Sequence, residues 1–273
     1  MTLYITDLDG TLLRSDASLS DYTVKTLNRL TDSGVIFTYA TARSFASASP
    51  LVNKLRLSCP AATFNGVFVI DPKTGQHIVK NVYSEHCQSL ATDFFEHEKI
   101  APLVYSYING EEKVSYLEDR IDDVRNYVES RRDDRRLRPV SSYKALFEGD
   151  IFYFTVIDPR ENIPALDGIF TAENGFSRNI QKDTYNDMIW YEIYDRSASK
   201  ANAVEQIKRL VGADELICFG DNLNDIPMIR AADIGVAVAN SHEELKSSAD
   251  LIIDSNDNDG VAKFIEQREL ARG

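Results

Sequence analysis

The stretch Leu3-Tyr4-Ile5-Thr6-Asp7-Leu8-Asp9-Gly10-Thr11-Leu12 decides the fold. Its residues 3–6 are apolar or β-branched, which predicts a short buried strand, and Gly10 permits a sharp turn just after it. Because side chains alternate along a strand, we expect Asp7 and Asp9 to point the same way at its carboxyl end. Ligands bind at this end of the strands in open α/β sheets. The two carboxylates therefore form either an ordinary acidic turn or a site in which a cation or a shared proton relieves their repulsion.

Strand and helix patterns alternate at both ends of the chain and are interrupted in the middle. From about residue 84 the pattern changes to hairpins, one of them across Asn109-Gly110, with a long strand-like stretch at 150–157. The alternation returns near residue 197. We therefore predict an α/β fold: a Rossmann-like, doubly wound parallel-sheet core with an inserted α+β cap domain. The predicted limits are 1–83 and 191–273 for the two core segments and 84–190 for the cap.

Composition restricts the function classes. A formal net charge of -13 argues against a nucleic-acid or anionic-membrane surface, so a phosphate substrate has to be attracted by a bound metal and a few placed cations. No stretch approaches the ~20 apolar residues of a membrane span, and Asp7 and Asp9 lie where a signal peptide would be apolar. The three cysteines, Cys59, Cys87 and Cys218, are scattered, which is typical of a reducing compartment. We expect a cytoplasmic protein.

Polar side chains recur at the carboxyl ends of the predicted core strands. Three carboxylates around one point form an oxygen-rich site for a hard cation, most naturally magnesium, while a lysine and a threonine hydroxyl suit a phosphate. Each residue also has an ordinary interpretation: Thr41 as a helix cap, Lys200 as a solvated helix residue, Asn224 and Asp225 as the first turn of a helix. The residues gathered in this way are Asp7, Asp9, Thr41, Lys200, Asp221, Asn224 and Asp225.

The order of four short motifs carries a family resemblance. The motifs are Asp7-Leu-Asp9-Gly10-Thr11-Leu12, Thr41-Ala42-Arg43, Ser197-Ala-Ser-Lys200 and Gly220-Asp221-Asn-Leu-Asn224-Asp225. In this order the chain resembles the haloacid dehalogenase superfamily of phosphohydrolases, specifically its Cof-type (subfamily IIB) members with a large α/β cap. The resemblance covers the whole chain. Many relatives have Thr-Gly-Arg in the second motif, so Ala42 is a departure that tolerates a helical backbone there but not a left-handed one.

The resemblance implies a role for each matching residue. Asp7 becomes the nucleophile that forms an aspartyl-phosphate, and Asp9 protonates the leaving oxygen and then activates water. Magnesium is expected at the Asp7 carboxylate, the Asp9 backbone carbonyl and Asp221, supported by Asn224 and Asp225. The implied phosphate-binding residues are Thr41, Ala42, Asn65, Lys200 and Asn224, and Lys200 also offsets charge on the nucleophile. The presence of Asp9 favours hydrolysis of a small ester.

The predicted function is a magnesium-dependent phosphohydrolase for small phosphate monoesters. The resemblance implies sugar phosphates first, then phosphorylated cofactors such as pyridoxal phosphate or flavin mononucleotide. The alternatives are a phosphosugar mutase and a non-catalytic regulator that binds phosphorylated metabolites. We expect a small-molecule phosphate ester as the partner, no nucleic acid or membrane, and a monomer or weak homo-oligomer. Arg43 either touches substrate or pairs with an acidic neighbour, and the arginine-rich run 131–138 is expected to be a solvated helix end and loop.

Overall fold

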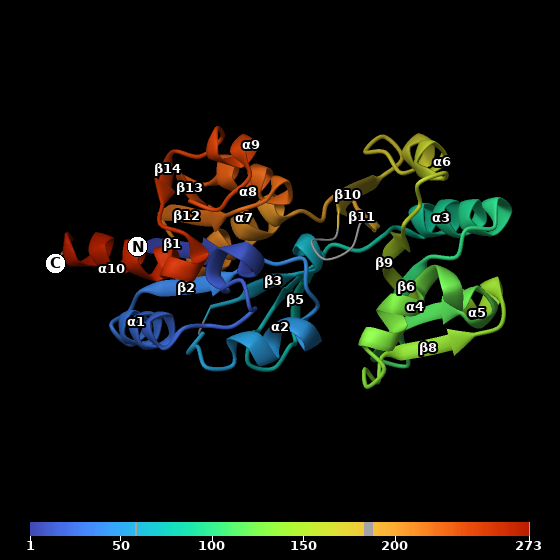
Figure 1. Cartoon of the computed structure of the whole chain (residues 1–273), viewed down its shortest axis with the longest axis horizontal. Helices are drawn as coiled ribbons and strands as arrows, with labels where there is room; N and C mark the ends of the chain where they lie inside the picture. Colours follow the sequence, from blue (N-terminus) through green and yellow to red (C-terminus); the bar gives the residue numbers. More distant parts are fainter. Residues whose placement is uncertain (58, 183–187, 273) are drawn as a thin grey trace. The chain divides into compact units, whose positions relative to one another are not determined.

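The chain folds into two compact units. A computed structural model describes residues 1–57, 59–182 and 188–272 (Figure 1). One unit combines Met1–Lys80 with Ala198–Gly273, and the other is Asn81–Ser197. We call them the core unit and the cap unit.

The core unit is built on a parallel sheet of five strands. Its order is β14-β13-β12-β1-β2, so the first strand lies inside the sheet, between β12 from the last third of the sequence and β2 from its beginning (Figure 1). The strands are β1 (Thr2–Thr6), β2 (Ile36–Tyr39), β12 (Glu215–Gly220), β13 (Ile234–Val238) and β14 (Leu251–Ile253). Because all five strands run the same way, their carboxyl ends meet at one edge, where β1 and β12 are neighbours. The predicted α/β fold with a parallel core sheet is confirmed.

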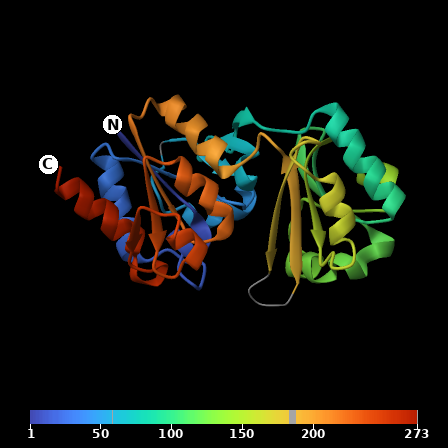
Figure 2. The same cartoon turned by 90° about the horizontal axis from the view of Figure 1, so that it is seen from above.

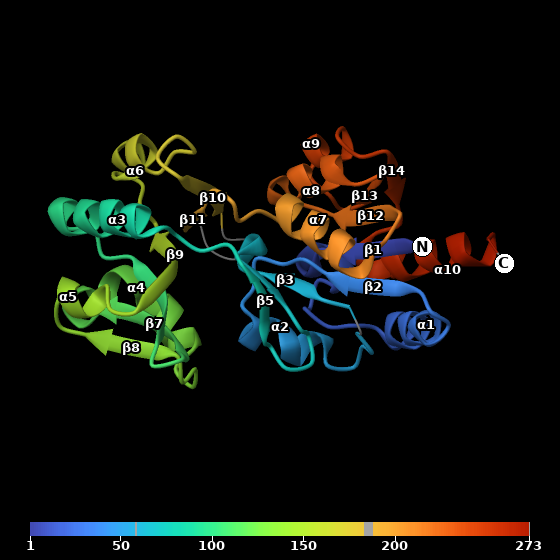
Figure 3. The same cartoon turned by 180° about the vertical axis from the view of Figure 1, so that it is seen from behind.

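Helices cover both faces of this sheet. On one face α7 (Lys200–Val211) and α8 (Ile226–Ala231) pack on Leu3, Ile5 and Leu216 (Figure 3). On the other face α1 (Asp21–Asp32) lies beside α10 (Gly260–Leu270), shown in blue and red in Figure 2. The remaining core elements are α2 (Phe45–Val52), α9 (Glu243–Lys246), the single turns η1 (Leu8–Leu12), η2 (Phe64–Gly66), η4 (Leu223–Asp225) and η5 (Asn256–Asn258), and a small antiparallel sheet of β3 (Ala61–Thr63), β4 (Phe68–Ile70) and β5 (His77–Lys80).

The cap unit is a mixed sheet of six strands with helices packed on it. Its order is β10-β11-β9-β6-β7-β8, antiparallel except for the parallel pair of β7 and β8. The strands are β6 (Leu103–Ile108), β7 (Glu111–Leu117), β8 (Leu137–Val140), β9 (Asp150–Ile157), β10 (Phe176–Lys182) and β11 (Ile189–Asp195). The helices are α3 (Glu85–Glu98), α4 (Ile121–Ser130), α5 (Tyr143–Leu146) and α6 (Ile163–Ile169), with the turn η3 (Glu118–Arg120). Phe95, Phe154 and Tyr191 are part of its apolar core.

Two details of the cap test the sequence analysis. The hairpin turn at Asn109-Gly110 is confirmed, since both residues have positive φ as a type I′ turn requires. The prediction of a helix end and loop over 131–138 is wrong at its last residues, because Leu137 and Arg138 belong to the edge strand β8. The sequence pattern also predicts a strand over 187–194, and its first residue, Asp187, lies outside the described residues. None of the helices in the described part of the chain combines the length and the apolar character that crossing a bilayer needs.

Candidate active site

The site begins at the turn after β1. Asp7 directly follows the strand, and its N–H donates to the carbonyl of Phe219 in β12 at 2.9 Å, which ties the turn to the neighbouring strand. The backbone then reverses at Gly10, whose φ is 74°. A Cβ at position 10 would lie 2.4 Å from Asp221 Oδ2, so only glycine allows the Asp221 carboxylate to come this close. The strand ends at Thr6, so the expected alternation does not extend to Asp9, which lies in the kinked turn η1.

Lys200 joins two of the predicted carboxylates. It is the first residue of α7, which Ser199 caps by accepting a hydrogen bond from the N–H of Asn202 at 3.0 Å. Lys200 Nζ lies 2.5 Å from Asp7 Oδ1 and 2.5 Å from Asp225 Oδ1. The side chains of Lys200, Asp7 and Asp225 are only 2%, 9% and 0% exposed. We call these three residues the buried charge triad.

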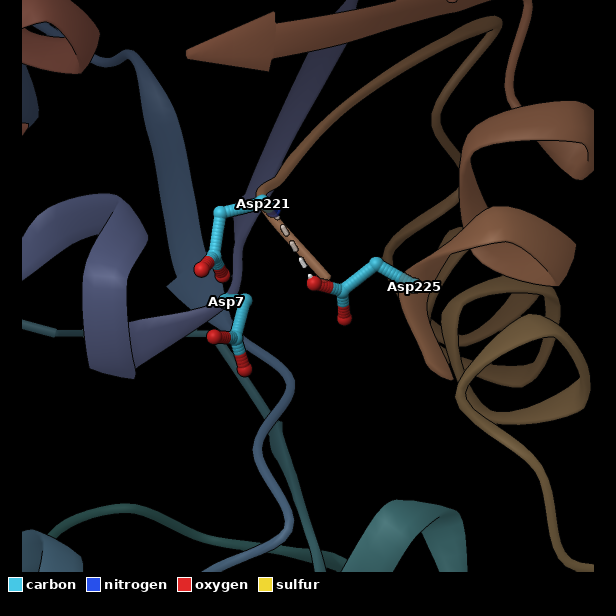
Figure 4. A group of neighbouring side chains, drawn as sticks. All are labelled: Asp7, Asp221 and Asp225. Atoms are coloured by element: carbon cyan, nitrogen blue, oxygen red, sulfur yellow. Dashed lines mark hydrogen bonds between the residues drawn. The ribbon is translucent and has the colours of Figure 1, made fainter. Parts of the chain in front are cut away.

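Asp225 uses both of its oxygens within the protein. Oδ1 accepts from Lys200, and Oδ2 accepts from the N–H of Asn222 at 3.2 Å. Oδ2 also accepts from the N–H of Asp221 at 3.1 Å, the bond that is dashed in Figure 4. The neighbouring Gly220 has no side chain to obstruct this approach, since a Cβ there would lie 2.6 Å from the Cβ of Asp225. Asp225 therefore orients Lys200 and the loop that carries Asp221, which fits the supporting role expected for it.

The electrostatics of this cluster favour a bound cation. Burial raises the pKa of Asp7 well above its ordinary value, and the nearby carboxylates of Asp225, Asp221 and Asp9 add to the effect although Lys200 opposes it. Burial and the charge of Asp225 raise the pKa of Asp221 to about 7. Burial alone would lower the pKa of Lys200, but Asp225 and Asp7 outweigh it and raise that pKa, so the ammonium stays charged.

The acidic residues fit a divalent metal. Oxygens of Asp7, Asp221 and Asp225 all lie within 4.8 Å of one another and converge on one region (Figure 4). Three ionised carboxylates and one ammonium leave a net charge of about −2, which one divalent cation would neutralise. Asp7 Oδ2 and Asp221 Oδ2 accept no hydrogen bond from the described residues, whereas Asp221 Oδ1 accepts from Thr11 Oγ1 at 2.9 Å. Carboxylate oxygens are the donors that magnesium prefers.

The predicted phosphate-binding residues lie at the end of β2 and after β3. Thr41 is buried, and its Oγ1 accepts from the N–H of Arg43 at 3.2 Å. The cap of α2 is Ser44, which accepts from Ser47 N–H at 3.1 Å, so the alternative interpretation of Thr41 as that cap is wrong. Ala42 does not occur among the described residues with positive φ, which removes the conflict that its replacement of glycine raised.

Asn65 and Asn224 meet although 159 positions separate them. Asn224 Nδ2 lies 3.5 Å from Asn65 Oδ1, and the N–H of Asn65 donates to the carbonyl of Thr41 at 3.0 Å. Gly66 permits a close approach to α7, because a Cβ at this position would lie 2.3 Å from the carbonyl oxygen of Ser199. The loop after β3 is thus fixed next to the residue that precedes Lys200.

Asp9 pairs with Arg43 at a more exposed position. Arg43 Nε lies 2.6 Å from Asp9 Oδ2, and Nη2 lies 2.7 Å from Oδ1. The side chains of Arg43 and Asp9 are 33% and 51% exposed, and we call them the exposed ion pair. Asn240 was missed by the sequence analysis: its Nδ2 donates to the carbonyl of Gly10 at 2.7 Å. Its position just after β13, at the same edge of the sheet, is the signal that would have indicated it.

Comparison with known proteins agrees with this geometry. The model of haloacid dehalogenase-like hydrolases matches residues 4–265. The chain belongs to this family. It is therefore a phosphatase that acts on small phosphate esters, as the motif order predicted. The match includes all four motifs and the cap unit between the second and the third.

Individual relatives match over nearly the full length. The chain is 26% identical to the 5-amino-6-(5-phospho-D-ribitylamino)uracil phosphatase YitU of Bacillus subtilis, over 96% of this chain and 95% of that protein. A haloacid dehalogenase-like hydrolase from Bacteroides thetaiotaomicron has a similar structure, with a TM-score of 0.78, 23% identity and coverage of 98% and 99%. The subclass IIB sugar phosphatase BT4131 has a TM-score of 0.72, 21% identity and coverage of 98% and 99%.

Proposed function

We propose that this phosphatase is a magnesium-dependent hydrolase of phosphorylated sugars and sugar alcohols that works through an aspartyl-phosphate on Asp7. The observation that carries the proposal is the buried charge triad beside Asp221. A carboxylate nucleophile has to stay ionised while a negatively charged phosphoryl group approaches it. Lys200 meets this need directly, because its Nζ lies 2.5 Å from Asp7 Oδ1.

Lys200 also has a donor left for the substrate. An ammonium has three N–H groups, and Asp7 and Asp225 accept two of them among the described residues. In the proposed mechanism the third N–H donates to a phosphoryl oxygen, and the hydroxyl of Thr41 donates to another. These donors orient the phosphorus for attack by Asp7.

The proposed reaction has two balanced halves. In the first, a carboxylate oxygen of Asp7 bonds to phosphorus, the bond to the ester oxygen breaks, and Asp9 gives its proton to the departing alcohol. In the second, Asp9 takes a proton from water, the water oxygen bonds to phosphorus, and the bond to Asp7 breaks. Inorganic phosphate leaves, and both carboxyl groups return to their starting state.

Asp7 and Asp221 are the residues that would hold the metal, with Asp225 and Asn224 supporting the loop. A bound magnesium ion would supply positive charge that keeps both carboxylates ionised and neutralises the phosphoryl oxygens. The raised pKa of Asp221, about 7, supports this requirement, because a proton competes for that carboxylate when no cation is bound.

The substrate class rests on the relatives. The name of the Bacillus subtilis relative states a phosphorylated ribityl compound, and the subclass IIB relative is described as a sugar phosphatase. The substrates that these two names state are phosphates of polyhydroxylated carbon chains. We therefore place phosphorylated sugars and sugar alcohols ahead of phosphorylated cofactors.

The test is phosphate release from a panel of esters, with and without magnesium, by the wild type and Asp7→Asn. The panel contains sugar phosphates, ribityl phosphates, pyridoxal phosphate and flavin mononucleotide. We expect magnesium-dependent release, fastest with the first two classes and abolished by the substitution. Release that needs a bisphosphorylated activator and returns an isomeric sugar phosphate would replace the hydrolase with a mutase. No release from any ester by the folded, metal-loaded protein would overturn the proposal.

A further inference from the structure

The exposed ion pair has a geometry that its position does not explain. Asp9 and Arg43 are 34 positions apart, yet two N–H groups of the guanidinium meet both oxygens of one carboxylate, at 2.6 and 2.7 Å. A planar guanidinium and a carboxylate match in this way only when both are held at the correct angle. Ion pairs this exposed contribute little to the free energy of folding, so stability gives little reason for the arrangement.

The backbone on the Arg43 side is fixed by its neighbours. The N–H of Arg43 donates to Thr41 Oγ1 at 3.2 Å, and its carbonyl accepts from the N–H of Phe64 at 2.9 Å. Phe64 and Asn65 both have positive φ, at 50° and 53°, a conformation that is unfavourable for a bulky residue such as phenylalanine. The chain accepts this strain at the point where it holds the carbonyl of Arg43.

The pair also lies close to the nucleophile. The hydrogen bonds between Arg43 and Asp9 raise the pKa of the Arg43 guanidinium, and the charge of Asp7 acts in the same direction. Arg43 therefore lies within electrostatic range of the carboxylate that attacks phosphorus, while its N–H donors are directed at Asp9. A guanidinium placed here holds the orientation of the Asp9 carboxyl.

We propose that Arg43 is a positioning residue for proton transfer: it fixes the orientation from which Asp9 protonates the leaving oxygen and then activates water. This inference rests on the proposed function, in which Asp9 is the general acid and base. One N–H of Arg43 can keep its bond to the carboxyl while the other carboxyl oxygen faces the departing alcohol. Arg43 acts through Asp9 and not through the phosphate.

The leaving group separates this role from the alternatives. A general acid matters for an alcohol such as a sugar hydroxyl, which leaves poorly, and little for p-nitrophenol, which leaves without a proton. We would measure kcat/KM with a sugar phosphate and with p-nitrophenyl phosphate, because this parameter covers the steps through departure of the alcohol. Arg43→Ala should lower it about 30-fold or more with the sugar phosphate and less than about 5-fold with p-nitrophenyl phosphate. Arg43→Gln should behave similarly, and Arg43→Lys should recover part of the loss.

A double-mutant cycle gives the decisive result. With p-nitrophenyl phosphate, adding Arg43→Ala to Asp9→Ala should change kcat/KM by less than 2-fold, because the residue through which Arg43 acts is gone. With the sugar phosphate, the loss in the Asp9→Ala background should likewise vanish. The matched control is Arg29→Ala, which removes another arginine–carboxylate pair of the core unit, that with Glu266, and should leave both substrates unchanged.

Failure of this inference can be told apart from failure of the proposed function. Equal losses with the two esters, or a full additional loss in the Asp9→Ala background, would show that Arg43 binds phosphate directly or only supports the loop, and would overturn the inference. In that case the wild type still hydrolyses both esters. If the wild type hydrolyses neither ester, the proposed function itself is wrong.

Discussion

The first turn carries two carboxylates only two positions apart, and they differ in burial and in their cationic partner. Asp7 is buried and shares one ammonium with Asp225, whereas Asp9 is half exposed and has a guanidinium to itself. The buried charge triad has to keep its charges in a place where water cannot stabilise them, and the exposed ion pair does not. From this difference in burial we infer that the triad supplies charge for the proposed reaction and that the pair supplies orientation. Five predictions test this division.

Asp7→Asn should have the largest effect, on activity. An amide neither attacks phosphorus as a carboxylate does nor forms the covalent intermediate, so kcat with p-nitrophenyl phosphate should fall by at least about 10⁴-fold. Folding should be preserved, because the substitution removes a charge whose burial is unfavourable. Steady-state kinetics and thermal unfolding measure the two effects. Turnover within 10-fold of the wild type would remove Asp7 from its proposed role.

Lys200→Met should have the largest effect on stability. It keeps most of the side-chain volume but leaves Asp7 and Asp225 buried without their cation, which should lower the free energy of unfolding by about 3–5 kcal/mol. The matched control is Lys208→Met on the same helix, whose pair with Asp233 is exposed and should cost less than about 1 kcal/mol. Urea unfolding of both variants provides the measurement. Equal losses for the two lysines would contradict the special status of the triad.

The stability of the metal-free protein should depend on pH through Asp221. Its pKa is raised from 3.8 to about 7 in the folded state, so between these values the folded protein holds a proton that the unfolded chain releases. This contribution to stability is complete below about pH 4 and is lost as the pH rises towards 7, with a slope of about 1.4 kcal/mol per pH unit. The difference between wild type and Asp221→Asn across this range isolates the effect. If stability changes with pH in the same way in the two proteins, the pKa of Asp221 is not raised in the folded state.

Magnesium should offset the loss above pH 7. The ion binds the ionised form of the site, so adding it should raise the thermal midpoint of the wild type and leave Asp221→Asn nearly unchanged. The same shift in both proteins would place the ion elsewhere.

Arg43→Ala should have the smallest effect on stability. The exposed ion pair contributes less than about 1 kcal/mol to folding even though its loss impairs proton transfer. Urea unfolding beside Lys200→Met gives a direct comparison of the pair and the triad. A loss of several kcal/mol in the free energy of unfolding would mean that Arg43 is a structural residue. Its kinetic effect would then no longer indicate a role in orienting Asp9.

The sequence predicted which residues form the site better than it predicted the contacts between them. Strand ends and motif order placed Asp7, Asp221 and Asp225 together, because parallel strands bring their carboxyl ends to one edge. The sequence did not predict that Arg43 pairs with Asp9. This contact depends on the loop geometry around Phe64 and on the rotamers of the two side chains, which no local pattern encodes. The strand β8 was missed because it is short, lies at an edge, contains a proline and directly follows a run of charged residues, which masks its pairing with β7.

The proposed function depends above all on phosphorylation of Asp7. We would mix the protein with substrate and magnesium, stop the reaction with acid, reduce the product with borohydride and map the peptides by mass spectrometry. Borohydride converts a phosphorylated aspartate to homoserine, so we expect homoserine at position 7 in the wild type and none in Asp7→Asn. Homoserine at another aspartate, or turnover without any reduced residue, would contradict it.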